Sequence, residues 1–328
     1  MKVGLFVTLE IEGHQDMGQH LREIREQVMT ARDAGFDSLW VPQHFVTGPS
    51  MRQTASSPML GWLANMAPQM KLGTAVLLLP MLNPVLLAEE AATLDHLTEG
   101  GFVLGVGLGY RDHEFAALGI ERKSRVGRFR EYVQAIRALW TSDNVTFHGK
   151  YVHLDNVSLA IRPRDPASMP LWIGGTVEDA VKRAAELGDS WQGAGAMSME
   201  EMKRWWGVFH QARVDYGKPL QYARQVSREC FCGPSMTQAM DLARGPIGAK
   251  YTRYAGHGFG GFAGDDGFAQ FARDRFVIGD EAYVKDELQR YRDELGATEM
   301  RFRMAWPGLP QEEVLASIRR VGRIAAAL

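Results

Sequence analysis

Short apolar runs alternate along this chain with longer segments in which apolar residues recur at helical spacing. Continuous apolar strands that alternate with helices are typical of a parallel sheet. Eight such units in 328 residues predict an α/β fold, a closed (β/α)₈ barrel of the TIM type, with an open doubly wound sheet as the alternative. The predicted strands cover residues 2–7, 37–41, 71–80, 102–108, 170–175, 188–194, 222–233 and 298–306.

Helix signals lie between these runs. Asn83 and Pro84 form a typical helix start, an N-cap followed by proline at the first helical position. Gly35 stands where a C-cap glycine would end the first helix. Further helices are predicted over 58–68, 125–140, 177–187, 199–216, 280–295 and 311–327.

Two segments interrupt the alternation of strands and helices. Residues 141–169 contain an alternating stretch that turns at His148 and Gly149, which predicts a small inserted hairpin. Residues 245–267 hold eight glycines and show neither a helical nor a strand period. Because a loop of this length inside a compact domain is usually functional or disordered, we predict one domain over 1–328 with a long mobile loop at about 245–278.

The composition narrows the class of protein. A hydrophobic content of 45% supports a large core, and a net charge of -2 argues against nucleic acid or an anionic membrane as partner. The two cysteines, Cys230 and Cys232, exclude a disulfide framework. Residues 1–10 have too short an apolar run for a signal peptide, and no stretch approaches the ~20 apolar residues of a membrane span. We therefore expect a cytoplasmic protein.

The catalytic groups of such a barrel lie just after each strand, at its carboxyl end. His44 follows the second predicted strand in the stretch SLWVPQHF. Considered by itself, it is either a catalytic group or an ordinary hydrogen-bonded histidine of the rim. Arg301 and Arg303 alternate on the last strand and face one side, which favours solvated or helix-paired arginines. No set of metal ligands with clear spacing follows the strands, so we expect no metal.

Two glycine-rich stretches suggest a bound cofactor. GVGLGY has Tyr110 where the dinucleotide fingerprint needs its last glycine, so we interpret the glycines as making room for a neighbouring side chain or a flat ring. In WIGGT, residues 174–176 precede a helix, where uncovered backbone N–H groups can hold a phosphate without a lysine. A tight turn with Thr176 as N-cap explains the second stretch equally well.

Taken together, these stretches resemble the bacterial luciferase-like flavin-dependent monooxygenase family. The resemblance covers nearly the whole chain. It begins with GFDSLWVPQHF, passes through LGTAVLLLPMLNPVLLAEEAATLDHLTEGGFVLGVGLGY and ends with RYRDELGATEMRFRMAWPGLP. The order and spacing of these pieces carry the resemblance, and the second piece is the most specific.

The resemblance implies a TIM barrel with a flavin across its mouth and His44 as the active-site histidine. It also implies a non-proline cis peptide bond between Ala75 and Val76, under the flavin ring. The cofactor-binding residues expected from the resemblance and from the strand ends are Ala75, Val76, Asn83, Gly107, Tyr110, Arg111, Gly174, Gly175 and Thr176. The Gly-rich loop would be a mobile lid that offers Tyr251, Tyr254, His257 and Phe259 to the substrate.

The chain departs from the family pattern near the phosphate turn. Bacterial luciferase has an arginine where Leu108 stands and an acidic residue where Gly175 stands. Deazaflavin-dependent members often have a lysine shortly after the turn, where this chain has Glu178 and Asp179. Because these carboxylates oppose the poly-acidic tail of the deazaflavin coenzyme F-420, the sequence favours FMN.

The expected activity is monooxygenation, in which reduced FMN and O₂ form a flavin hydroperoxide that oxygenates a small organic, apolar or aromatic substrate. The chain has no nicotinamide-binding fingerprint, so a separate NAD(P)H:flavin reductase would supply reduced FMN, and we expect a homodimer. The alternatives are a deazaflavin (coenzyme F-420)-dependent dehydrogenase or reductase on the same fold, a non-catalytic flavin-binding protein, and an unrelated barrel enzyme without flavin.

Overall fold

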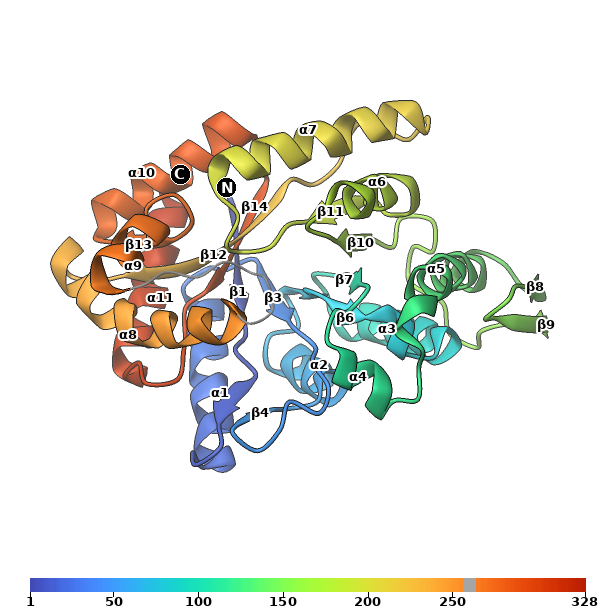
Figure 1. Ribbon diagram of the computed structural model, residues 1–328, viewed down its shortest axis with the longest axis horizontal. Helices are drawn as coiled ribbons and strands as arrows, with labels where there is room; N and C mark the ends of the chain where they lie inside the picture. The colour runs from blue at the N-terminus through green and yellow to red at the C-terminus, as the bar shows by residue number, and fades with distance from the viewer. Residues whose placement is uncertain (256–263) are drawn as a thin grey trace. The chain divides into compact units, whose positions relative to one another are not determined.

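The structure, a computed structural model, describes residues 1–255 and 264–328, with the backbone only at 253–255 and 264–266. The chain divides into two compact units, whose helices and strands are labelled in Figure 1. Unit 1 comprises residues 1–40, 193–208 and 223–328, and unit 2 comprises residues 41–192 and 209–222. No helix in the described part of the chain is both long and apolar enough to cross a membrane.

Unit 1 is built on parallel strands in the order β3-β1-β14-β12-β13. Its strands are β1 (Lys2–Phe6), β2 (Glu10–Glu12), β3 (Ser38–Val41), β12 (Gln225–Cys232), β13 (Val277–Gly279) and β14 (Glu299–Arg303). Its helices are α1 (Met17–Asp33), α8 (Met236–Ala255), α9 (Gly264–Ala272), α10 (Glu281–Leu295) and α11 (Gln311–Ala326), and α7 (Met199–Asp215) contributes residues to both units.

Unit 2 has parallel strands in the order β11-β10-β7-β5, and the short β6 also pairs with β7. Its strands are β4 (Met51–Gln53), β5 (Lys71–Thr74), β6 (Leu77–Leu78), β7 (Phe102–Gly107), β8 (Val145–His148), β9 (His153–Val157), β10 (Leu171–Gly174) and β11 (Ser190–Gln192). Its helices are α2 (Ser56–Met66), α3 (Pro84–Leu97), α4 (Asp112–Ala117), α5 (Arg125–Thr141) and α6 (Glu178–Leu187), with 3₁₀ turns at Leu79–Met81 and Arg122–Ser124.

The α/β class and most predicted elements are confirmed. The predicted helix start at Asn83 is one example. The Asn83 side chain accepts hydrogen bonds from the backbone N–H groups of Val85 and Leu86 at 2.9 and 3.3 Å, so it satisfies two donors that the helix itself cannot. Helices α3 and α5 then pack against each other (Figure 1). The indole N–H of Trp140 donates to the Ala88 carbonyl at 3.1 Å and fixes this pair.

The third predicted strand and the Gly-rich loop differ from expectation. The run 71–80 breaks into β5 and β6 at residues 75–76 and ends in a 3₁₀ turn. The segment predicted as a loop from 245 is helical to Ala255 and again from Gly264, and β13 is a parallel strand that the pattern did not predict. Tertiary packing overrides the glycines here, because Ala243, Ile247 and Tyr251 of α8 are buried in one apolar cluster of unit 1.

The two arginines of β14 are buried, so the expectation of solvated or helix-paired side chains is wrong. The Arg301 guanidinium lies 4.3 Å from the centre of the Trp40 ring and hydrogen-bonds Gln225. Arg303 forms an ion pair with Glu10 at 3.0 Å. Both arginines therefore stabilise the interior of unit 1, where planar guanidinium groups stack on aromatic rings.

Strands β8 and β9 pair antiparallel, and their turn is attached to α5 through one carboxylate. Glu131 accepts the backbone N–H groups of Lys150, Tyr151 and Val152 at 3.0, 2.6 and 3.2 Å. The Arg128 guanidinium lies 5.0 Å from the centre of the Tyr151 ring. These contacts hold the turn in one conformation.

Candidate functional site

His44 lies three residues beyond the end of β3 and is held by a carboxylate from α4. Its Nδ1 atom is 2.9 Å from Oε1 of Glu114, and the backbone N–H of Phe45 donates to the same oxygen at 3.0 Å. Glu114 is fully buried, whereas the His44 side chain keeps 14% of its surface exposed. The histidine is therefore fixed by its inner nitrogen and remains accessible.

The charge state of Glu114 decides how His44 is protonated. Burial acts to raise the pKa of Glu114, but the hydrogen bond and charge of His44, the Phe45 N–H and the charge of Arg111 outweigh it and leave the pKa below its usual value. An ionised carboxylate only accepts hydrogen bonds, so Nδ1 must carry the proton. This leaves Nε2 as the His44 nitrogen that can gain or lose a proton.

Aromatic and cationic side chains extend the site from His44. The Tyr110 ring meets the imidazole edge-on, with ring centres 5.8 Å apart. The Arg111 guanidinium lies 5.5 Å from the centre of the Tyr110 ring, and its buried Nε has no hydrogen-bond partner within the described residues. The structure thus brings His44, which follows β3, together with Tyr110 and Arg111, which follow β7.

The peptide bond between Ala75 and Val76 is cis, as the resemblance implies. The Val76 side chain explains two glycines of the strand ends. A Cβ atom would lie 2.7 Å from a Val76 methyl at Gly107 and 3.0 Å from one at Gly174. Both glycines therefore make room for Val76. For Gly107 this agrees with the interpretation that the GVGLGY glycines admit a neighbouring side chain, whereas Gly174 was expected to help hold a phosphate.

The phosphate turn at residues 174–176 fits its predicted role only in part. The Gly175 N–H donates to the Gln192 carbonyl at 3.2 Å, and the Gly175 carbonyl accepts the Trp191 indole N–H at 2.9 Å. Helix α6 begins at Glu178 with Val177 as its N-cap, so the alternative of a Thr176 N-cap is wrong. The exposed Thr176 and the first N–H groups of α6 remain as the groups of the turn that could hold a phosphate.

Two arginines that the sequence analysis did not single out have a buried nitrogen that could pair with an anionic group. The Nε atoms of Arg125, at the start of α5, and Arg183, in α6, are buried without a hydrogen-bond partner in the described parts of the chain. Burial lowers the pKa of both, and a neighbouring arginine lowers each further, Arg122 for Arg125 and Arg130 for Arg183. A bound phosphate would relieve both penalties.

Other predicted site residues have structural partners or lie outside the described chain. Asn83 uses its side chain as the cap of α3. Tyr251 is 4% exposed and donates to Glu229 at 3.1 Å, so it belongs to the core of unit 1 rather than to a lid. Nothing is described for the Tyr254 side chain, and His257 and Phe259 lie outside the described residues.

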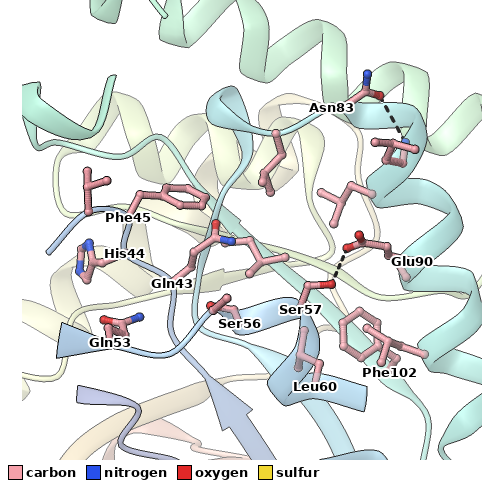
Figure 2. Close-up of a pocket in the computed structure, with 18 residues that line it drawn as sticks. Gln43, His44, Phe45, Gln53, Ser56, Ser57, Leu60, Asn83, Glu90 and Phe102 are labelled. Carbon is pink, nitrogen blue, oxygen red and sulfur yellow. Dashed lines mark hydrogen bonds between the residues drawn. The ribbon is translucent and has the colours of Figure 1, made fainter. Parts of the chain in front are cut away.

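A cavity of about 380 Å³ adjoins His44 within unit 2. Figure 2 shows His44 and Gln53 on one side of it and Glu90 and Phe102 on the other, with Gln43 between them. The cavity extends between α2 and α3. A binding volume of this size therefore begins at the histidine that the sequence singled out.

Comparisons with known proteins show the family of the chain. The chain matches the family described as luciferase-like monooxygenase over residues 1–299. An F-420-dependent glucose-6-phosphate dehydrogenase of Amycolatopsis mediterranei is 35% identical over 187 residues, 55% of each chain. A 4-hydroxyprotoasukamycin monooxygenase of Streptomyces nodosus subsp. asukaensis is 30% identical over 217 residues, 63% of this chain and 58% of the relative. The chain therefore spans a little over half the length of these relatives.

A solved structure supports the fold over the full length. The oxygenating constituent of the 3,6-diketocamphane monooxygenase of Pseudomonas putida, a type II Baeyer-Villiger monooxygenase in complex with FMN, superposes with a TM-score of 0.82. The alignment covers 100% of this chain and 98% of that chain at 19% identity, so it supports the fold alone. With the family match over residues 1–299, the chain belongs to the luciferase-like monooxygenase family of oxidoreductases.

Proposed function

We propose that the protein is a flavin-dependent monooxygenase that uses reduced FMN and O₂ to oxygenate a small organic substrate. The observation that carries this proposal is the pair formed by His44 and Glu114 beyond a strand end. A bound reduced flavin would supply the electrons that activate O₂. The protein would supply the proton transfers at Nε2 of His44, with Glu114 holding the ring.

The residues of unit 2 suggest how FMN would be held. The phosphate would be bound by Thr176, the first N–H groups of α6, and Arg125 and Arg183, whose buried Nε atoms lack partners in the described chain. Gly107 and Gly174 leave room for the Val76 side chain, so they would shape the flavin site without donating hydrogen bonds to the flavin. We also propose that the strands close into an eight-stranded barrel, that the protein is a homodimer, and that a separate reductase delivers reduced FMN.

The second candidate is a coenzyme F-420-dependent dehydrogenase. The similarity to F-420-dependent glucose-6-phosphate dehydrogenase favours it, and a histidine oriented by a carboxylate also suits removal of a proton from an alcohol. Against it stand the exposed Glu178 and Asp179 at the start of α6, which would repel a poly-acidic cofactor tail more strongly than the single phosphate of FMN.

An anaerobic titration separates the two candidates. The purified protein is titrated with reduced FMN and with reduced F-420, and each mixture is then exposed to O₂ while O₂ consumption is recorded. The monooxygenase proposal expects tighter binding of reduced FMN and O₂ consumption that depends on the protein. Tight binding of F-420 with hydride transfer to or from an alcohol and no O₂ consumption would replace it with the dehydrogenase.

A further inference from the structure

The cavity beside His44 has an apolar interior and a more polar entrance. Its deepest lining residues are Leu60, Phe102, Leu87 and Ala91, which are 2%, 2%, 4% and 0% exposed. The polar lining residues Ser57 and Glu90, by contrast, are exposed. Burying hydrocarbon against such walls is favourable by the hydrophobic effect, so the interior selects for an apolar body.

One polar side chain in the lining, Gln53, has no hydrogen-bond partner within the described part of the chain. Both amide atoms of Gln53 are buried, and neither has a hydrogen-bond partner among the residues that the structure describes. Other polar groups nearby are satisfied, since Gln43 accepts the Leu78 N–H at 2.9 Å and Ser56 donates to the Pro42 carbonyl at 2.7 Å. Because buried amides are almost always paired, Gln53 indicates a hydrogen-bonding group in the occupant.

The charges around the cavity limit the occupant further. None of the described residues that line it is Lys or Arg, and Glu90 is its one carboxylate, held by the Ser57 hydroxyl at 3.1 Å. Away from His44, a carboxylate or phosphate in the cavity would therefore lie without a cationic partner and close to the negative charge of Glu90. The lining excludes anionic molecules and accepts neutral ones.

We propose that this cavity binds the substrate, a neutral molecule with a two-ring hydrocarbon body and one hydroxyl or carbonyl group that pairs with Gln53. Its volume of about 380 Å³ sets the size, since an apolar cavity of roughly 150 Å³ holds one benzene. His44 lines the same cavity, which places the occupant beside the proposed acid–base group. That the occupant is a substrate rests on the proposed function, whereas the prediction that the cavity binds such a molecule does not.

Binding is tested without flavin, with naphthalene, 2-naphthol and 2-naphthoate as probes of one size and different head groups. Ligand-observed NMR on the full chain is expected to give the order 2-naphthol, naphthalene, 2-naphthoate, from tightest to weakest. The substitution Gln53→Leu should remove the advantage of 2-naphthol over naphthalene. Equal or tighter binding of 2-naphthoate would overturn the proposal, because away from His44 the described lining has no cation to pair with the carboxylate.

Two variants of α3 locate the binding. Ala91→Leu fills the interior and should weaken both neutral probes about tenfold or more, whereas Thr93→Leu, an exposed position of the same helix outside the lining, should leave them unchanged. If Ala91→Leu does not fold, Leu87→Ala enlarges the cavity and should shift preference toward a three-ring alcohol. Unchanged 2-naphthol affinity in a folded Ala91→Leu protein, or unchanged size preference in Leu87→Ala, refutes the site. Naphthol binding without FMN binding would instead refute the proposed function and keep the site.

Discussion

The imidazole Nδ1 of His44 lies 2.9 Å from the carboxylate of Glu114, although 70 positions of sequence separate the two residues. Because the buried carboxylate accepts a hydrogen bond from this nitrogen, it fixes both the orientation and the tautomer of the ring. The outer nitrogen is then available for proton transfer. His44 and Glu114 therefore form one hydrogen-bonded unit.

Substitution of either residue should slow turnover to different extents. His44→Ala removes the acid–base group and is expected to lose about 10²–10⁴-fold in turnover with the fold intact. Glu114→Gln keeps a hydrogen-bond acceptor but loses its charge, so a loss of about five- to tenfold is expected. Steady-state rates and circular dichroism check both. His113→Ala, an exposed histidine of the same segment, is the control, and a near-normal rate in His44→Ala would exclude His44 from the chemistry.

Acid should weaken the contribution of Glu114 to stability. Although burial acts to raise it, the pKa of Glu114 lies below its ordinary value of 4.5 because His44, Phe45 and Arg111 favour the charged form. A depressed carboxyl pKa stabilises the folded state above the unfolded value, and this stability is lost as pH falls through the folded value. Denaturant titrations below about pH 4.5 should show a steeper loss in the native protein than in Glu114→Gln. Parallel pH curves for the two proteins would contradict the assignment.

Gly105 should tolerate no side chain. A Cβ atom there would lie 1.8 Å from the Thr74 carbonyl oxygen and 2.4 Å from the Gln192 amide nitrogen. We expect Gly105→Ala to lower the free energy of unfolding by about 3 kcal/mol or more, in the upper range for overpacking. Gly61 in α2 has open space around it, so Gly61→Ala should be neutral or stabilise by about 0.5–1 kcal/mol. Chemical denaturation measures both variants.

Lys250 should be needed mainly because Glu229 is buried. Glu229 is 3% exposed. It accepts hydrogen bonds from the Lys250 ammonium, from the Tyr251 hydroxyl and, at 2.6 Å, from the Trp306 indole N–H. Lys250→Met leaves the carboxylate charge without its cation and should cost about 3–5 kcal/mol. Adding Glu229→Gln should recover much of this loss. If the double variant is less stable than the single one, the interaction is not a charge pair.

The two thiols should be inert in the folded protein. Cys230 and Cys232 are both fully buried. Burial raises the pKa of Cys232 to about 12 and that of Cys230 well above its usual value, so the reactive thiolate is scarce. Iodoacetamide at about pH 8 should modify neither residue until denaturant is added. Modification of the native protein, followed by mass spectrometry, would show that β12 opens.

The sequence predicted the strand-end residues better than their partners. His44 and Tyr110 follow apolar runs, so local pattern was enough to place them. Glu114 lies in a six-residue helix and meets His44 only through tertiary folding, which no local period records. Its one signal was a carboxylate next to Phe115 in the segment just after a strand, and that signal is common in loops.

The segment from 245 shows the opposite failure, in which local signals were strong but misleading. Glycines and Pro246 argue against a helix, yet α8 continues through them. The apolar spacing of Ala243, Ile247 and Tyr251 repeats every four residues and was visible in the sequence. Burial of that stripe outweighs the helix-breaking residues, because packing of an apolar face contributes more to a helix than propensity does.

The hairpin of β8 and β9 has a consequence for protein engineering. Its turn at residues 150–152 is shaped by the carboxylate of Glu131, about 20 positions upstream on another element. A hairpin transplanted into a related scaffold would thus lose its turn conformation unless a glutamate were placed on the receiving helix. A recombination site between α5 and β8 would separate Glu131 from the hairpin and yield chimeras with a disordered turn. A site before α5 would transfer the helix and the hairpin together.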